Sequence, residues 1–293
     1  MMRKLFAILS VTLLLTTACE KEDMLPNVQQ AIVVEGWIEN DDYPVVIVTK
    51  SLPVSKDFQN INKLEELLVR WAKVTVSDGT KSVVLTGRYD KMYYPPYVYT
   101  TSHLKGEIGK TYQLKVEYYD FLVTAVTTIP APPVIDNYKV VKCADSDTLF
   151  QITACFKDNP REKNYYQFFT KVGTDTNHYI GSYLGSIDDN MISGAVEYPV
   201  YRGRTIKEYD SYTPYFSISE KVSVKFAQVD HASFRFWDAF TKSQSLNDNM
   251  FFSTSTSLPS NIHGGTGYWC GYGAINTHFV IADYADNTLE KTE

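Results

Sequence analysis

Short segments in which apolar and polar residues alternate recur between turn signals in the first half of the chain. Residues 71–77 (WAKVTVS) alternate with period two, which predicts a half-buried β-strand. Asp78 and Gly79 supply a turn, and residues 81–85 return as the second strand of a hairpin. The first strand is expected to turn two sets of residues to opposite faces: Trp71, Lys73, Thr75 and Ser77 on one, and Ala72, Val74 and Val76 on the other.

Similar segments continue the pattern. Residues 31–38, 44–48, 112–118 and 123–129 are rich in β-branched and aromatic residues and end at turn residues. About seven short strands at this spacing predict an immunoglobulin-like or related β-sandwich over residues 31–130. Residues 63–70 (KLEELLVR) fit either a short helix or the start of a strand.

A proline-rich segment separates this region from a second one. Residues 131–133, together with Pro130, form a stiff linker that is poor in backbone donors. Further strands are predicted at 134–143, 148–156, 164–172, 217–228 and 278–282, and Asp230 can cap a helix that carries Phe236, Trp237 and Phe240 on one face. We therefore expect a mainly β chain with two β-sandwich-like domains, the second at 134–285 with one short helix, followed by a tail at 286–293.

The amino terminus has the pattern of an export signal. Arg3 and Lys4 precede a largely apolar run, and small residues lead to Cys19. Residues 1–18 thus resemble a bacterial lipoprotein signal peptide with Cys19 as the lipidated residue, although a cysteine beside an ordinary cleavage site gives the same pattern. Residues 19–30 begin with the acidic run EKED and form a leader. Such a run after the lipidated cysteine resembles the signal that sends lipoproteins of Bacteroidota to the outer face of the outer membrane.

Composition excludes several classes of protein. The formal net charge of −6 argues against nucleic-acid binding, which requires a basic surface. With 14% aromatic residues the chain is not mainly disordered. After residue 20 no apolar run approaches the length of about 20 residues that a membrane-spanning helix needs.

Three cysteines remain besides Cys19. Because Cys143 and Cys155 flank one predicted hairpin, they are a possible disulfide pair, and Cys270 stays single.

The sequence contains no recognised catalytic motif. G-x-S-x-G, H-E-x-x-H and the phosphate-binding G-x-x-x-x-G-K-[ST] are all absent. His263, Cys270 and His278 lie near one another in sequence, but their spacing is wider than that of most zinc sites and no fourth ligand stands out. A carboxylate pair for glycoside hydrolysis stays open. We expect no enzyme activity, no metal and no cofactor.

Two aromatic segments are candidates for ligand or partner contact. Tyr and Trp offer a large contact area at small entropic cost. Residues 93–99 join tyrosines to a stiff Pro-Pro pair, and residues 264–273 are expected to form a flexible Gly-rich loop from which aromatic rings project. Rings that merely cover a sheet give the same pattern. The candidate residues are Tyr93, Tyr94, Tyr97, Tyr99, Tyr268, Trp269 and Tyr272.

The order of motifs resembles a known family. V-V-E-G-W-I at 33–38, A-K-V-T-V-S-D-G at 72–79 and G-K-T-Y-Q-L-K-V at 109–116 precede the proline linker. D-N-P…N-Y-Y at 158–166, the Phe236-Trp237 helix and P-S-N-I-H-G-G-T-G-Y at 259–268 follow it. This order is similar to that of Bacteroidota outer-membrane lipoproteins of the domain-of-unknown-function 4249 family, and the A-K-V-T-V-S-D-G segment also recurs in transthyretin-like sandwiches.

The resemblance implies a role but no chemistry. It supplies no catalytic residues, and it implies an accessory lipoprotein that works with a TonB-dependent β-barrel transporter in nutrient uptake. We therefore expect a non-catalytic, ligand-capturing lipoprotein anchored in the outer membrane through Cys19 and facing the cell exterior. A surface adhesin or structural lipoprotein is one alternative, and a surface glycan- or peptide-active hydrolase is another.

Overall fold

The computed structural model describes residues 30–51, 65–159, 161–173, 178–192, 194–204, 212–246 and 258–284. The described chain is mainly β with a single α-helix, which confirms the predicted mainly β, sandwich-like fold. The signal segment 1–18, Cys19, nearly all of the leader and the tail 286–293 lie outside the described residues.

An eight-stranded sheet runs through the whole molecule. Its strand order is β12-β11-β15-β16-β1-β2-β6-β5. The first-half strands are β1 (Ile32–Glu39), β2 (Val45–Lys50), β5 (Thr86–Tyr89) and β6 (Tyr97–Thr100). The later strands are β11 (Tyr165–Val172), β12 (Ile180–Asp188), β15 (Lys221–Val229) and β16 (Thr266–Val280).

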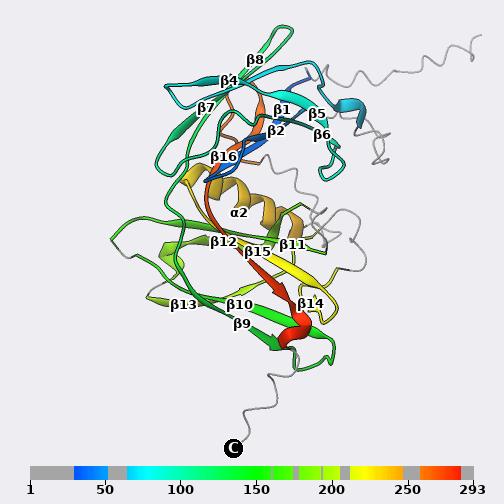
Figure 1. Cartoon of the computed structure of the whole chain (residues 1–293), viewed down its shortest axis with the longest axis vertical. Coiled ribbons are helices and arrows are strands. Elements are labelled where there is room, and N and C mark those ends of the chain that lie inside the picture. Colours follow the sequence, from blue (N-terminus) through cyan, green and yellow to red (C-terminus); the bar gives the residue numbers. More distant parts are fainter. Residues whose placement is uncertain are drawn as a thin grey trace, which may run out of the picture.

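Two smaller sheets pack on this large sheet and complete two sandwiches, which appear as upper and lower lobes in Figure 1. The N-terminal one has the order β4-β3-β7-β8. Its strands are β3 (Lys73–Ser77), β4 (Ser82–Val84), β7 (Thr111–Tyr118) and β8 (Phe121–Thr128). In the C-terminal one, β10 (Leu149–Lys157) pairs with β9 (Ile135–Lys142), β13 (Ala195–Val200) and β14 (Phe216–Ser217). Short 3-10 helices follow β12 (Asp189–Met191) and β16 (Ile281–Tyr284).

Three hydrophobic clusters fill the interior. The N-terminal sandwich encloses a mostly aliphatic core that includes Val34, Val74 and Leu114. A phenylalanine-rich core fills the C-terminal sandwich, where Phe168 and Phe226 stack with ring centroids 4.2 Å apart. The third cluster lies under helix α2 (His231–Leu246) and contains aromatic residues of the helix and of β16.

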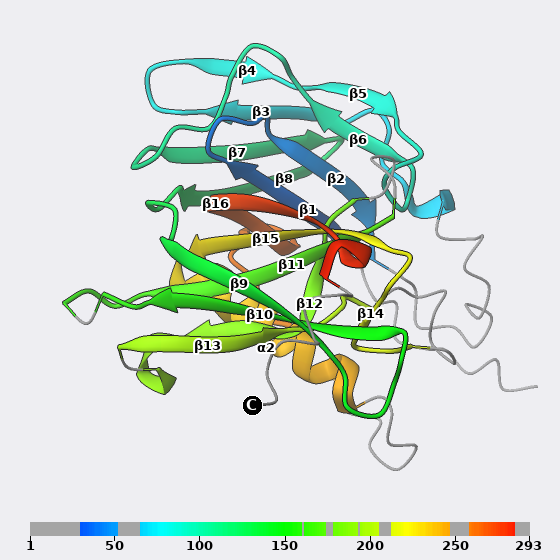
Figure 2. The ribbon, with the colours of Figure 1, turned by 60° about the horizontal axis from the view of Figure 1, so that its bottom comes forward.

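Strand β16 belongs to both sandwiches. Its first half, Thr266 to Tyr272, pairs in parallel with β1, and its second half, Gly273 to Val280, pairs antiparallel with β15. Figure 1 and Figure 2 show it passing from one lobe to the other. Residues 266–272 therefore complete the N-terminal sheet, although they lie within the second predicted domain, 134–285. Parallel pairing needs a long crossover connection, which local sequence patterns do not reveal.

Helix α2 begins where its sequence predicted. The Asp230 carboxylate accepts a hydrogen bond from the Ser233 backbone N–H at 2.7 Å, which is an N-cap contact. The predicted helix over 230–240 is thus confirmed, and it continues to Leu246. No helix within the described ranges has the length and apolar character needed to cross a membrane.

The predicted hairpin around Gly79 is confirmed. Ser77 pairs with Ser82, and Gly79 takes a φ of 87°, which favours glycine. Val74 and Val76 are fully buried, as their alternation predicted. For residues 63–70 the structure decides between the two alternatives only in part: residues 65–67 form a 3-10 turn, and Leu68 pairs with Thr49.

The possible disulfide is not formed. Cys143, Cys155 and Cys270 are all free thiols. Although β9 and β10 do form the predicted hairpin, Cys143 hydrogen-bonds Leu149 while Cys155 pairs with Asn137 further along the ladder. Six residues of β10 separate these two positions, or roughly 20 Å at the rise of a strand. This is far beyond the reach of a disulfide, whose Cα atoms lie about 4.4–6.8 Å apart.

Candidate functional site

A cavity of about 220 Å³ lies where the two sandwiches meet, on the face of the large sheet that also carries α2. The N-terminal lobe contributes residues from β1, the following turn, β2 and the segment before β6. The C-terminal lobe contributes residues from β11, β15, α2 and the segment leading into β12, and the shared β16 completes the lining. The lining residues are Trp37, Glu39, Asp42, Val45, Met92, Tyr93, Phe169, Lys171, His178, Tyr179, Lys225, Trp237, Tyr268 and Tyr272.

One side of the cavity is an aromatic wall made by Trp37, Tyr93 and His178. The rings follow one another, with centroids 5.9 Å apart from Trp37 to Tyr93 and 6.0 Å apart from Tyr93 to His178. Burial lowers the pKa of His178, so its imidazole is neutral at pH 7. Burial, reinforced by nearby carboxylates including Asp90 and Asp42, raises the pKa of Tyr93. Both groups therefore present uncharged ring faces and edges to the cavity.

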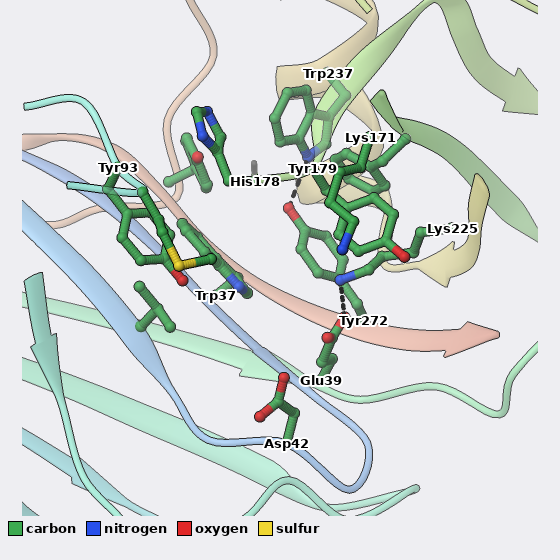
Figure 3. A pocket seen from close by; sticks show the side chains of 14 residues that line it. Trp37, Glu39, Asp42, Tyr93, Lys171, His178, Tyr179, Lys225, Trp237 and Tyr272 are labelled. Carbon is green, nitrogen blue, oxygen red and sulfur yellow. Dashed lines mark hydrogen bonds and ion pairs between the residues drawn. The ribbon is translucent and has the colours of Figure 1, made fainter. Parts of the chain in front are cut away.

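The opposite side holds a charged cluster, defined by Lys171, Lys225, Glu39 and Tyr179 (Figure 3). The Lys225 ammonium donates to the Glu39 carboxylate at 2.5 Å, and the two side chains are only 7% and 10% exposed. Tyr179 lies under both ammonium groups, with Lys225 Nζ 4.4 Å and Lys171 Nζ 5.3 Å from its ring centroid. Burial raises the pKa of Tyr179 to about 12, so the phenol is neutral.

The floor near α2 is built from hydrogen-bonded aromatic residues. Trp237 Nε1 donates to the Tyr272 hydroxyl at 3.0 Å, and Phe169 packs edge-on against Trp237 with centroids 5.1 Å apart. Burial raises the pKa values of Tyr268 and Tyr272 well above the usual range. This floor is therefore neutral at physiological pH, and the charges of the site belong to the lysines and carboxylates beside it.

A serine–histidine contact lies beside the cavity. Ser223 Oγ and His278 Nδ1 are 2.7 Å apart, and the two residues are direct partners in the β15–β16 ladder. Nucleophilic catalysis also needs a group that orients the base and donors that stabilise an oxyanion. The strand register alone accounts for this contact. Within the described ranges no group of three or more His, Cys, Asp or Glu side chains is arranged to hold a metal ion.

The structure separates the tyrosines of residues 93–99. Only Tyr93 lines the cavity. Tyr99 is buried in the N-terminal core, where its hydroxyl donates to the Val69 carbonyl at 2.7 Å, and the Tyr97 hydroxyl donates to the Arg70 carbonyl at 3.1 Å. Tyr94 is partly exposed outside the cavity lining. These residues do not form one flat contact surface. Tyr97 and Tyr99 share one face of β6, where their ring centroids are 5.6 Å apart, whereas Tyr93 and Tyr94 precede the strand.

The second aromatic segment is not a flexible loop. Residues 266–273 lie within β16 and are paired with β1 or β15 along their length. Tyr268 and Tyr272 line the cavity, whereas Trp269 faces the other side of the sheet and is fully buried in the N-terminal core. There Trp269 Nε1 donates to the Tyr112 carbonyl at 3.0 Å. The expectation of a loop is wrong because Gly267 and Gly271 allow close backbone approach to β1 and β8: an added Cβ would lie 1.9 Å from the Val34 carbonyl oxygen or 2.5 Å from that of Thr128.

All four residues of the charged cluster were missed by sequence reasoning. Glu39 follows the alternation of β1, in which Glu35, Trp37 and Glu39 share the face opposite Val34 and Ile38. Lys225 likewise lies in the part of β15, residues 222–227, that is buried throughout. A charged residue inside a strand that is buried on both faces is the available signal, since such a charge needs a partner. Glu39 and Lys225 are 186 residues apart in sequence, and only the fold pairs them.

The fold and the site define a mainly β protein of two sandwiches that share one continuous sheet and enclose an aromatic, charge-bearing pocket at their junction. The family follows from a direct sequence match. Residues 21–275 match the family described as Domain of unknown function (DUF4249), so this chain belongs to that family. No curated protein matches the chain significantly.

Proposed function

We propose that this protein is a surface-exposed outer-membrane lipoprotein that captures a small ligand, without catalysis, for a TonB-dependent transporter. The observation that supports ligand capture is the pocket between the two sandwiches. It is concave, mostly aromatic and equipped with a few converging polar groups, as small-molecule sites usually are. Neither lobe contains the site alone, because Trp37 and Tyr93 come from the first and Lys171 and Tyr179 from the second.

The proposed location is supported by the sequence before the described residues. A basic start, an apolar run and Cys19 form the lipoprotein pattern, and the acidic residues after Cys19 favour the outer face of the outer membrane. A cysteine that carries more than one acyl chain would be anchored stably, since each buried methylene contributes about 0.8 kcal/mol.

The partner is tested by a gentle detergent pull-down of the tagged protein from its native outer membrane, followed by mass spectrometry. We expect one large TonB-dependent β-barrel protein in near-equal amount. Recovery of the lipoprotein alone, in a detergent that keeps other outer-membrane complexes intact, would contradict the transporter partnership.

The anchor and its orientation are tested by two further measurements. Cys19→Ala should release the protein from the membrane fraction, whereas the control Cys143→Ala should leave it there. Protease added to intact cells should cleave the wild-type protein. Resistance on whole cells with cleavage only after lysis would contradict exposure at the surface.

The two alternatives predict different results. A surface adhesin would bind host or matrix material equally well in cells that lack the transporter. A hydrolase would show turnover of a glycan or peptide that is lost when one carboxylate, such as Asp42 at the pocket, is changed to its amide.

A further inference from the structure

We infer that the pocket between the sandwiches takes a small organic anion: a carboxylate carried on one six-membered ring, with the carboxylate beside Lys171 and Lys225 and the ring against Trp37 and Tyr93. The inference rests on the proposed capture function and adds the chemical class of the ligand. Three observations support it: the charges of the lining side chains, the burial of Lys225 and the volume of the pocket.

The charged cluster contains more positive than negative charge. Lys171 and Lys225 carry two ammonium groups at neutral pH, and Glu39 is the one carboxylate paired with them. Within the described chain Lys171 makes no ion pair, and its ammonium lies over the Tyr179 ring instead. A ligand carboxylate between the lysines would balance the cluster.

Lys225 also has unused hydrogen-bonding capacity. An ammonium group has three donors. Among the residues that the structure describes, Lys225 Nζ makes one hydrogen bond, to Glu39, and its side chain is only 7% exposed. A buried ammonium with free donors beside a cavity favours an acceptor in that cavity, because leaving such donors unpaired is costly.

The other carboxylate of the lining does not reverse this balance. Asp42 lies in the turn after β1 and is exposed, and Figure 3 places it at the opposite end of the charged side from Lys171. Exposed charges are screened by solvent and salt much more than buried ones. The lining around the buried Lys225–Glu39 pair therefore has an excess of positive charge, which comes from the partly buried Lys171, although the whole chain is acidic.

The size and the aromatic wall define the rest of the ligand. A cavity of about 150 Å³ holds benzene. The 220 Å³ of this pocket suits one ring with a short charged substituent. Trp37 and Tyr93 offer ring faces on the side opposite the lysines, so a flat ring can pack there while its carboxylate reaches the ammonium groups (Figure 3).

The test is calorimetric titration of the full chain, purified in mild detergent, with matched probes. Phenylacetate and glucuronate carry the carboxylate on an aromatic and on a sugar ring. Phenylacetamide and glucose are their neutral counterparts, and phenethylammonium carries the opposite charge. We expect at least one of the carboxylates to bind tenfold or more tightly than its neutral counterpart, and the better of the two identifies the ring.

Variants assign the binding to the two sides of the pocket. Lys171→Met keeps the aliphatic stem and should weaken carboxylate binding about tenfold while leaving the neutral probe unchanged. Trp37→Ala should weaken both. Lys50→Met is the matched control, since Lys50 also lies over a tyrosine ring, 5.7 Å from the Tyr118 centroid, but lines a different hollow. If Lys171→Met lowers the melting temperature, Lys171→Gln replaces it.

Each contrary result is specific. Equal affinity for a carboxylate and its neutral counterpart, or preference for phenethylammonium, would overturn the anion assignment while leaving ligand capture intact. Binding of no probe would overturn the proposed ligand class. The transporter partnership is decided separately by the pull-down, which does not depend on any probe.

Discussion

The N-terminal core and the cluster beneath α2 lie on opposite faces of the same strand, yet they differ in chemistry. Trp269 faces the N-terminal core, where most neighbours are aliphatic and its one polar atom is satisfied by a backbone carbonyl. Its neighbours Tyr268 and Cys270 face the helix, among aromatic rings that continue into the pocket. One face forms a closed core, and the other opens onto a cavity with buried charges.

This difference shows where the protein keeps buried charged groups at a cost in stability. A buried ion pair is often no more stable than apolar residues of similar size. The Glu39–Lys225 pair nevertheless lies at the junction of the lobes and beside the cavity, and these two are the charged residues among the buried residues of the described chain. Local departures from apolar packing of this kind are expected at functional sites.

The largest expected effect is on the closed face. Trp269→Ala removes a fully buried ring and leaves the Tyr112 carbonyl without its donor. We expect a loss of about 3–5 kcal/mol in the free energy of unfolding, measured by urea denaturation. Trp71→Ala is the control, because Trp71 is 89% exposed, and it should change the stability little. A loss in the free energy of unfolding as small as that of Trp71→Ala would contradict the description of this face of β16 as a closed core.

Breaking the buried ion pair should have the next largest effect. Lys225→Met leaves Glu39 buried without its partner, and we expect a loss of about 3 kcal/mol by the same measurement. The double variant Lys225→Met/Glu39→Gln should recover part of the loss, because no unpaired charge is left. Lys221→Met on the exposed end of β15 is the control. Equal stability of the single and double variants would show that the pair is not coupled.

The cap of α2 connects the two faces and should contribute less. Asp230 accepts from the Ser233 N–H and from the Thr127 hydroxyl at 3.2 Å, and Thr127 Oγ1 in turn accepts from the Gly271 N–H. Asp230→Ala should lower stability by about 1–2 kcal/mol in thermal unfolding. Asp238→Ala, which removes only a surface i,i+4 pair with Lys242, should cost less than about 0.5 kcal/mol. A larger loss of stability from Asp238→Ala than from Asp230→Ala would contradict the capping role of Asp230.

The smallest effect concerns Glu35, which shares its strand face with Trp37 and Glu39. Burial raises the pKa of Glu35 above its ordinary value of 4.5, so the ionised form is disfavoured in the folded state. Glu35→Gln should therefore stabilise the protein slightly at pH 7. The gain should shrink as the pH falls through the raised pKa and vanish below about 4.5, where the folded and unfolded carboxyls are both protonated. Melting temperatures at several pH values test this, with Glu66→Gln at an exposed glutamate as the control.

Local signals predicted many of the elements. The alternation of residues 71–77, the Asp78-Gly79 turn and the Asp230 cap each depend on neighbours within a few residues, and each appears in the structure. The misassigned segment is 264–273. Its glycines are typical of a loop, but in β16 they let neighbouring backbones approach closely. The predicted disulfide between Cys143 and Cys155 is not formed for a related reason. Two residues that flank one hairpin need not be cross-strand partners.

The β class, the positions of most strands, the helix and its cap are predictable from the amino-acid sequence, because alternation, turn residues and capping act over a few residues. Three features become visible only in the folded chain: β16 joins both sandwiches, Trp269 and Tyr268 face opposite sides of the sheet, and Glu39 pairs with Lys225. These features depend on pairing between segments far apart in the chain. Strand register and lobe packing select those partners, and the pocket exists only once both lobes and the shared strand are in place.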